Sequence, residues 1–280
     1  MPWWAKMAAK VVLARVPLNY QWFARAGLFR HGQMQGFDYA FGVVQHHVAK
    51  AGVDLRGKVA LELGPGDGLT GGLVARALGA ERVFLVDAGA FAHADMSVYQ
   101  QHAQALRASG MALPAIDHCR SLPELCEAAG LVYLTDGLVS LRQLASESVD
   151  FVWSHAVLEH IRHHEFDLTL EELARIAKPA AVASHRIDLQ DHLQNSLHNL
   201  RFSMQFWERD WMVRSGFYTN RLSYAEICQA FTRAGFTAVI GEVDRWPDLP
   251  VARAKMAAPF AQREVEELCI QGFSALLTLR

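Results

Sequence analysis

The chain has 280 residues, of which 51% are hydrophobic, enough to bury the core of one large domain. Its 27 Lys and Arg against 29 Asp and Glu give a formal net charge of −2, so no basic excess indicates nonspecific binding of nucleic acid. The four cysteines lack C-x-x-C or zinc-finger spacing, no apolar run reaches the ~18 to 20 residues of a membrane span, and the first residues do not resemble a secretory signal. We therefore expect a cytoplasmic protein with free thiols.

Short apolar runs alternate with helical patterns along the chain. We predict strands at residues 58–64, 82–88, 131–135, 149–155, 180–187, 236–243 and 273–279. Their nearly continuous hydrophobicity is typical of strands that are buried on both faces of a mostly parallel sheet. The alternation predicts a doubly wound α/β fold.

Two of the intervening helices carry recognisable start and stop signals. Thr169 precedes Glu172 and Ser223 precedes Glu226 by three residues, the spacing of a capping box, so we predict that helices begin there. Pro179 and Gly235 follow the two apolar-periodic runs and are predicted to mark their ends.

Two regions fall outside the alternation and divide the chain into expected domains. Residues 1–56 are predicted to form an N-terminal helical extension, and residues 57–280 the main domain, with an insertion at about 188–222. Both extra regions are rich in aromatic residues, and the insertion follows the C-terminal end of a strand, where open α/β sheets bind ligands. We predict that they cap the ligand, with aromatic core packing as an equal alternative.

The segment "ALELGPGDGLTGG", residues 60–72, places Gly64, Gly66 and Gly68 at alternate positions directly after a predicted strand. So many glycines in one loop indicate positive φ angles or close approach of a ligand to the backbone, although a tight turn is an alternative. Leu69 stands where a dinucleotide G-x-G-x-x-G would have its third glycine. Asp87, about 20 residues further on, ends the next strand, where a carboxylate accepts both hydroxyls of a ribose.

Four segments in order resemble the class I S-adenosylmethionine (SAM) dependent methyltransferases: "LELGPGDG", "VFLVDA", "YLTDGL" and "SVDFVWSHAVLEHI". The resemblance covers roughly residues 56–187 and is greatest to the small-molecule, methyltransferase type 11/12-like branch. It implies a Rossmann-like sheet of seven strands with an antiparallel last strand. It also implies SAM as the cofactor and S-adenosylhomocysteine as the product.

The same resemblance implies a role for each motif residue. Glu62 would face the amino group of SAM, and Gly64, Gly66 and Gly68 would let the backbone approach its methionine portion. Asp87 would hold the ribose diol, and Asp136 and the amide of Gly137 would contact the adenine edge. Ser154 would lie near the methionine and the transferred methyl. For Asp136, a plain turn in "TDG" is the alternative interpretation.

Histidines gather after the fourth and fifth predicted strands. His155 and His185 end adjacent strands and are our candidates for a general base, with Asp188 or Asp191 orienting the imidazole and His160 as a further catalytic candidate. Two other histidines, His163 and His164, are favoured as surface residues.

A divalent metal is a possible but not favoured alternative at the same place. Glu159, His160 and His185 offer oxygen and nitrogen ligands, but Ala156 stands where metal-binding relatives have the first Glu of a Glu-x-x-Glu-His run. We therefore name no metal ligand.

Three flanking segments extend the resemblance toward the acceptor: "LFRHGQM", "HRIDLQDHL" and "SGFYTNRLSYAE" are similar to a subgroup of bacterial glycan-associated methyltransferases. This implies O-methylation of a hydroxyl on a sugar or glycan precursor. O- or N-methylation of a natural product or other metabolite, and a catalytically silent SAM-binding regulatory protein, are alternatives.

Neither nucleic acid nor a membrane is an expected partner. A base-amino methyltransferase would carry Asn or Asp and two prolines where this chain has "SHAV". Membrane contact is expected only for a lipid-linked acceptor, through Trp3, Trp4, Met7 and Val11 opposite Lys6 and Lys10; packing of this helix on the domain is favoured. No oligomeric state is predicted.

Overall fold

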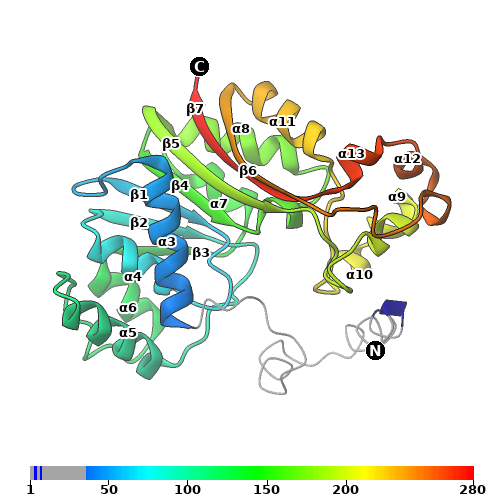
Figure 1. Ribbon diagram of the computed structural model, residues 1–280. Helices are drawn as coiled ribbons and strands as arrows, with labels where there is room; N and C mark the ends of the chain where they lie inside the picture. Colours follow the sequence, from blue (N-terminus) through cyan, green and yellow to red (C-terminus); the bar gives the residue numbers. More distant parts are fainter. Residues whose placement is uncertain (1–2, 5–6, 8–35) are drawn as a thin grey trace.

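The computed structural model describes residues 3–4, 7 and 36–280. A single sheet of seven strands forms its centre, in the order β3-β2-β1-β4-β5-β7-β6 (Figure 1). The strands are β1 (Val59–Leu63), β2 (Arg82–Val86), β3 (Leu131–Leu134), β4 (Val149–His155), β5 (Ala177–Asp188), β6 (Phe236–Arg245) and β7 (Ile270–Leu279). Only β7 runs antiparallel to its neighbours. This confirms the predicted fold and all seven predicted strands.

Helices cover both faces of the sheet, as its hydrophobic strands require. One face is covered by α3 (Phe37–Ala51), α4 (Thr70–Ala77), α5 (Met96–Ala108) and α6 (Leu122–Ala129), and the other by α7 (Leu138–Gln143), α8 (Phe166–Ile176) and α11 (Tyr224–Arg233). Neighbouring strand residues alternate between the two cores: Ala60 and Phe151 pack under α3 to α6, whereas Leu61 and Val152 pack under α7, α8 and α11. We call these the α4 face and the α8 face.

Residues 188–222, which we predicted as an insertion, contain short helices. After β5 come η2 (His198–Arg201), α9 (Met204–Trp207) and α10 (Asp210–Val213). A second irregular segment between β6 and β7, which the sequence reasoning missed, holds η3 (Arg253–Lys255), α12 (Ala258–Ala261) and α13 (Val265–Leu268). The two segments gather at one end of the sheet (Figure 1) and share a hydrophobic cluster that includes Leu200, Met256 and Phe260.

A buried arginine fastens these two segments together. The guanidinium of Arg221 lies 5.2 Å from the ring centroid of Trp207 and 4.7 Å from that of Phe260, and it donates to the carbonyl of Phe202 at 2.6 Å. Burial lowers the pKa of Arg221 to about 10, which still leaves it charged at neutral pH. Its cation–π and carbonyl contacts replace the lost water.

One of the two predicted helix starts is confirmed. Ser223 caps α11 in a complete capping box with Glu226, and Gly235, at φ +92°, follows its end. The prediction for Thr169 is wrong, because α8 begins one turn earlier at Phe166 and the Thr169 hydroxyl donates to the carbonyl of Glu165. Pro179 does not end α8 directly; it lies within β5.

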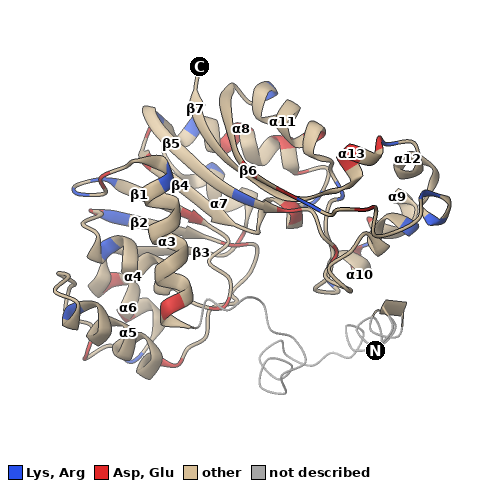
Figure 2. Ribbon diagram, in the orientation of Figure 1, with Lys and Arg blue, Asp and Glu red and all other residues tan. Residues whose placement is uncertain are grey.

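Charges of both signs are interspersed over the described part of the chain, without a basic stripe (Figure 2). Among the described residues, no helix is long and apolar enough to cross a bilayer. Trp3 stacks on His198 with 5.0 Å between ring centroids. Trp3 and Met7 also pack against a hydrophobic cluster that includes Trp207 and Phe217. Trp4 is 60% exposed. Val11, Lys6 and Lys10 lie outside the described residues.

Candidate functional site

The glycine loop follows β1 at the point where the strand order reverses, between β1 and β4. Gly64 and Gly66 have φ angles of +74° and +67°, which L side chains rarely adopt, whereas Gly68 does not have a positive φ. A Cβ on Gly64 would lie 2.5 Å from a methyl of Val157, whereas one on Gly66 would meet nothing within 4 Å. The loop after β4 therefore closes directly over Gly64, and the space beside Gly66 is open to a ligand.

Glu62 lies beneath this loop on the α4 face and is 3% exposed. Its carboxylate rests against the start of α4, where a Cβ on Gly71 would come within 2.5 Å of Oε2. Oε2 has no hydrogen-bond partner among the described residues. Burial raises the pKa of Glu62 to about 8, and the charge of Asp87 adds to the rise while the Trp153 indole opposes it. Oε2 therefore lacks a partner, and a ligand cation would supply one.

Asp87 directly follows β2, and its carboxylate bonds the backbone of two loops. Its carboxylate accepts the N–H of Gly66 at 2.8 Å and the N–H of Ala88 at 2.7 Å. Burial raises the pKa of Asp87 to about 6, and these two hydrogen bonds oppose the rise. Each oxygen keeps a lone pair that a ribose hydroxyl could use.

Of the two residues predicted to contact adenine, Asp136 is exposed, whereas the amide of Gly137 is already hydrogen-bonded. Asp136 is exposed, as a ligand contact requires, and its N–H is bonded to the hydroxyl of Ser140. The N–H of Gly137 is already donated to the carbonyl of Asp87 at 2.8 Å. In this arrangement the Gly137 amide joins two loops of the site, so the expected contact from that amide to adenine is not available.

Asp67, within the glycine loop, is a buried carboxylate that the sequence reasoning passed over. It is 7% exposed, and its Oδ1 has no partner among the described residues. Burial raises the pKa of Asp67 to about 6. Its carbonyl accepts the N–H of His93, whose two ring nitrogens are also buried and have no hydrogen-bond partner among the described residues. A carboxylate between two glycines of a binding loop was the signal that could have found it.

The two histidines predicted as general bases lie on opposite faces of the sheet. Ser154 of β4 is opposite His185 of β5, and their side chains share the α8 face, with Ser154 Oγ 2.7 Å from His185 Nδ1. His185 is 1% exposed, its ring faces Phe231 of α11, and burial lowers its pKa to about 4. The predictions for Ser154 and His185 therefore need correction. Both side chains lie in the core under α8 and α11, where they bond each other and do not face the glycine loop.

His155 points the other way, to the α4 face beside α3. It is partly exposed, and its Nδ1 lies 3.3 Å from Nε2 of His47, whose Nδ1 lies 2.8 Å from the hydroxyl of Ser184. The ring of Tyr39 also packs edge-on against His155 at 6.2 Å. Burial lowers the pKa of His155 to about 4, with Arg186 and His46 adding to the shift. His155 is thus a neutral imidazole at physiological pH.

The three residues that a divalent metal could have used are each held by separate partners. The buried Glu159 accepts the N–H of Asp188, and His185 bonds Ser154. His160, near the surface, donates from Nδ1 to the carbonyl of Tyr218 at 2.7 Å, and its Nε2 lies 3.0 Å from Nε2 of His192. No group of three or more potential ligands occurs among the described residues. The structure does not bring the three proposed ligands together.

Asp191 does not orient an imidazole. It is 1% exposed, and its carboxylate accepts the backbone N–H groups of Leu193, Gln194 and His198. It therefore holds the turn of the insertion that follows β5. His163 and His164 are exposed, as expected.

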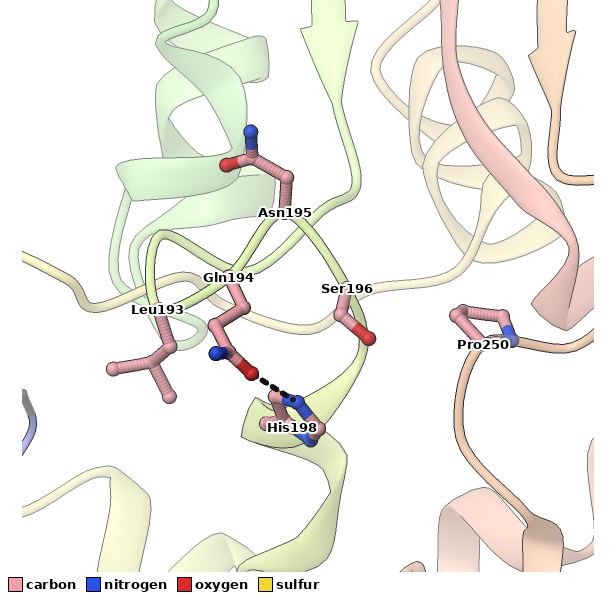
Figure 3. A pocket seen from close by; sticks show the side chains of 6 residues that line it. All are labelled: Leu193, Gln194, Asn195, Ser196, His198 and Pro250. Carbon is pink, nitrogen blue, oxygen red and sulfur yellow. Dashed lines mark hydrogen bonds between the residues drawn. The ribbon is translucent and has the colours of Figure 1, made fainter. Parts of the chain in front are cut away.

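An open cavity lies at the turn that follows β5. It is lined by Leu193, Gln194, Asn195, Ser196, His198 and Pro250, and the His198 Nε2 is bonded to the amide oxygen of Gln194 at 3.1 Å (Figure 3). Its lining contains none of the residues around Gly66, Glu62 and Asp87. We therefore regard it as separate from the site at the glycine loop.

Residues 61–184 match a family model described as "Methyltransferase domain". The matched segment begins in β1, ends in β5, and so contains the glycine loop, Asp87 and the loop after β4. This chain carries a SAM-dependent methyltransferase domain. A search of curated proteins gave no match.

Several solved methyltransferases resemble this domain at low identity. The SAM-dependent methyltransferase from Mesorhizobium loti is 15% identical over 86% of this chain and 100% of that one, with a TM-score of 0.45. YcgJ from Bacillus subtilis is 13% identical over 87% of this chain and 99% of that one, with a TM-score of 0.48. The phosphoethanolamine N-methyltransferase 2 of Haemonchus contortus, solved with phosphomonomethylethanolamine and S-adenosylhomocysteine, is 14% identical over 89% and 58%, with a TM-score of 0.48.

The site described above suits SAM by its own chemistry. Glu62 offers a buried carboxylate without a partner, Asp87 offers two oxygens at the end of β2, and Gly66 leaves open space beside the backbone. These features suit two polar groups of the cofactor, its ammonium and its ribose diol, and a methionine chain that passes close to the loop.

Proposed function

We propose that this methyltransferase domain transfers the methyl group of SAM to an oxygen of a small-molecule acceptor, with a hydroxyl of a sugar or glycan precursor as the first class to test. The observation that carries the proposal is His155, a neutral, partly exposed imidazole next to the loop that closes over Gly64. A neutral imidazole can take the proton that a hydroxyl loses on methylation.

In this proposal the residues of the glycine loop position the cofactor. Glu62 binds the amino group, Asp87 binds the ribose diol, and Asp136 contacts the adenine edge, while Gly64 and Gly66 let the backbone approach the methionine portion. SAM, when bound, supplies a methyl group that is activated on a sulfonium. Alignment of the acceptor with that methyl can supply roughly 7 to 11 kcal/mol of the barrier.

His155 then handles the proton of the acceptor. SAM, when bound, would supply the methyl carbon to the acceptor oxygen and keep the electron pair of the C–S bond on sulfur, and Nε2 of His155 would take the proton that the acceptor oxygen loses. The methylated oxygen is strongly acidic until it loses this proton, so even an imidazole with a pKa of about 4 can accept it. An amine acceptor would need this help less, which is why we favour oxygen.

The acceptor class can be tested with methyl-labelled SAM. The protein is incubated with fractionated extract of its source organism, and label is counted in the small-molecule, glycan, protein and nucleic-acid fractions. We expect label in the small-molecule or glycan fraction with the unmodified protein and with the surface variant Asp117→Asn, and much less label with Asp87→Ala at a SAM concentration below the Kd of that variant. Label in the protein or nucleic-acid fraction would overturn the proposal.

A further inference from the structure

A chain of three side chains leads from β5 through α3 to the candidate base. Ser184 Oγ and His47 Nδ1 are 2.8 Å apart, and His47 Nε2 and His155 Nδ1 are 3.3 Å apart. His47 is 1% exposed and Ser184 is 4% exposed, so water does not compete for either group. His47 belongs to the N-terminal extension, where the sequence reasoning placed no functional residue.

We propose that His47, supported by Ser184, is a positioning residue that holds His155 in the tautomer with its proton on Nδ1, so that Nε2 is free to accept the proton of the methyl acceptor. This inference rests on the proposed function, because it assigns His155 the role of base. It adds two residues and a direction of hydrogen bonding: His155 Nδ1–H donates to His47 Nε2, and His47 Nδ1–H donates to Ser184 Oγ.

The direction follows from the state that His155 must reach. A protonated imidazole carries N–H groups on both nitrogens, so the group beside Nδ1 has to be an acceptor. With the opposite direction, His155 would already carry a proton on Nε2 and could not take another there. His47 can supply the lone pair because burial lowers its pKa to about 3, which keeps it neutral at physiological pH.

Ser184 suits the far end of the chain because its hydroxyl can accept a hydrogen bond or donate one by rotation alone. The remaining titratable and charged groups near His155 are His46 and Tyr39 of α3 and Arg186 of β5. Arg186 disfavours a charged His155, although it is paired with Asp244. The lone pair of His47 is a contact that favours the protonated form of His155, against the effect of Arg186 and His46.

The first test reads the tautomer directly and needs no acceptor. The protein is labelled with ¹⁵N in its histidine rings, and the signals of His155 are assigned as those lost in His155→Ala. We expect Nδ1 protonated and Nε2 unprotonated in the unmodified protein, and a shift toward the other tautomer in His47→Leu, which has no acceptor. His47→Gln, whose amide oxygen can accept, should retain the first pattern. A proton on Nε2 in the unmodified protein would overturn the inference.

The second test compares turnover with cofactor binding in the same variants, using the extract fraction that takes up label. We expect His47→Leu to lower kcat about 100-fold, within the range of a lost general base, with the SAM Kd unchanged by calorimetry. His47→Gln should recover most of the activity, and Ser184→Ala should lie between. Full turnover in His47→Leu would overturn the inference.

The two tests separate this inference from the proposed function. If no fraction takes up label but His155 carries its proton on Nδ1, the assigned tautomer stands and the proposed function falls. If label is transferred but His155 carries its proton on Nε2, the proposed methyl transfer stands, and the positioning role of His47 falls. Should His47→Leu fail to fold, the spectra of the unmodified protein and of His47→Gln still decide.

Discussion

The buried carboxylate of Glu62 gives the sharpest prediction, because one substitution should move stability and cofactor affinity in opposite directions. Glu62→Gln keeps the size of the side chain and removes its charge. Without a cofactor, the charge costs stability, since the carboxylate is 3% exposed and Oε2 has no described partner. With the cofactor, the same charge is the group we expect to bind the ammonium.

The cost of the charge follows from the pKa of Glu62. It rises from 4.5 to about 8 on folding, so between these pH values the folded protein binds more protons at this site than the unfolded chain. Stability contributed by this group is therefore lost as pH rises through that window. The loss amounts to about 3 to 4 kcal/mol between pH 5 and pH 8, as an upper range. Glu62→Gln does not titrate and should escape it.

Thermal unfolding without cofactor measures the first effect. At pH 5 the two proteins should have similar Tm values, and at pH 8 the Gln variant should be the more stable by roughly 6 to 10 °C. Other titrating groups are common to both proteins and cancel in the comparison. Calorimetry with SAM measures the second effect, and we expect affinity to fall by about 100-fold or more, the result of removing one member of a buried ion pair.

Two results would refute this reasoning. A Tm for Glu62→Gln that lies below that of the unmodified protein at pH 8 would show that the carboxylate is stabilised by an interaction that the structure does not contain. An unchanged SAM affinity would show that Glu62 does not meet the ammonium. A variant that is merely misfolded would lose both stability and affinity, which is a distinguishable outcome.

Further predictions concern the loops and one helix of the domain. Asp87→Ala should weaken SAM binding measured by calorimetry by about 30-fold, through two lost hydrogen bonds of roughly 1 kcal/mol each, with circular dichroism unchanged; an unchanged affinity would remove the ribose assignment. Gly64→Ala should lower Tm and SAM affinity together, because its Cβ would lie 2.5 Å from Val157 at a positive φ, whereas an unchanged Tm would contradict that geometry. Ser223→Ala should cost about 1 kcal/mol in urea unfolding through the lost cap of α11, and Ser223→Thr should cost little; equal losses would argue against the cap. His185→Ala should reduce stability and leave turnover per folded molecule intact, whereas turnover lost at full stability would restore it as the base.

The sheet could be predicted from the sequence because its signals are local. Each strand is a short apolar run, and its burial on both faces leaves the run nearly unbroken. The start of α11 was predictable for the same reason, since Ser223 and Glu226 satisfy each other across three residues. The start of α8 was not, because Phe166 is 2% exposed and its packing begins the helix a turn before the Thr169 signal.

Parts of the site that depend on contacts between distant segments escaped prediction. His47 lies 108 positions from His155 and 137 from Ser184, and nothing in its neighbourhood distinguishes it from His46. The second irregular segment, residues 246–269, contains no strong helix signal, and its packing comes from Arg221 and from residues of the first insertion. These contacts exist only once the fold has formed.

The assignment of the base depends on strand register rather than on position in the sequence. His155 and His185 both lie near the ends of adjacent parallel strands, so the sequence presented them as equivalent. In the sheet, His155 is opposite Arg186 and His185 is opposite Ser154, a difference of one residue that directs their side chains to opposite faces. His155 therefore faces α3, and the His185 ring is enclosed against α11. If His155 is the base, the acceptor must approach from the α3 side of β4, so residues of the N-terminal extension such as Tyr39 should influence which acceptors are methylated.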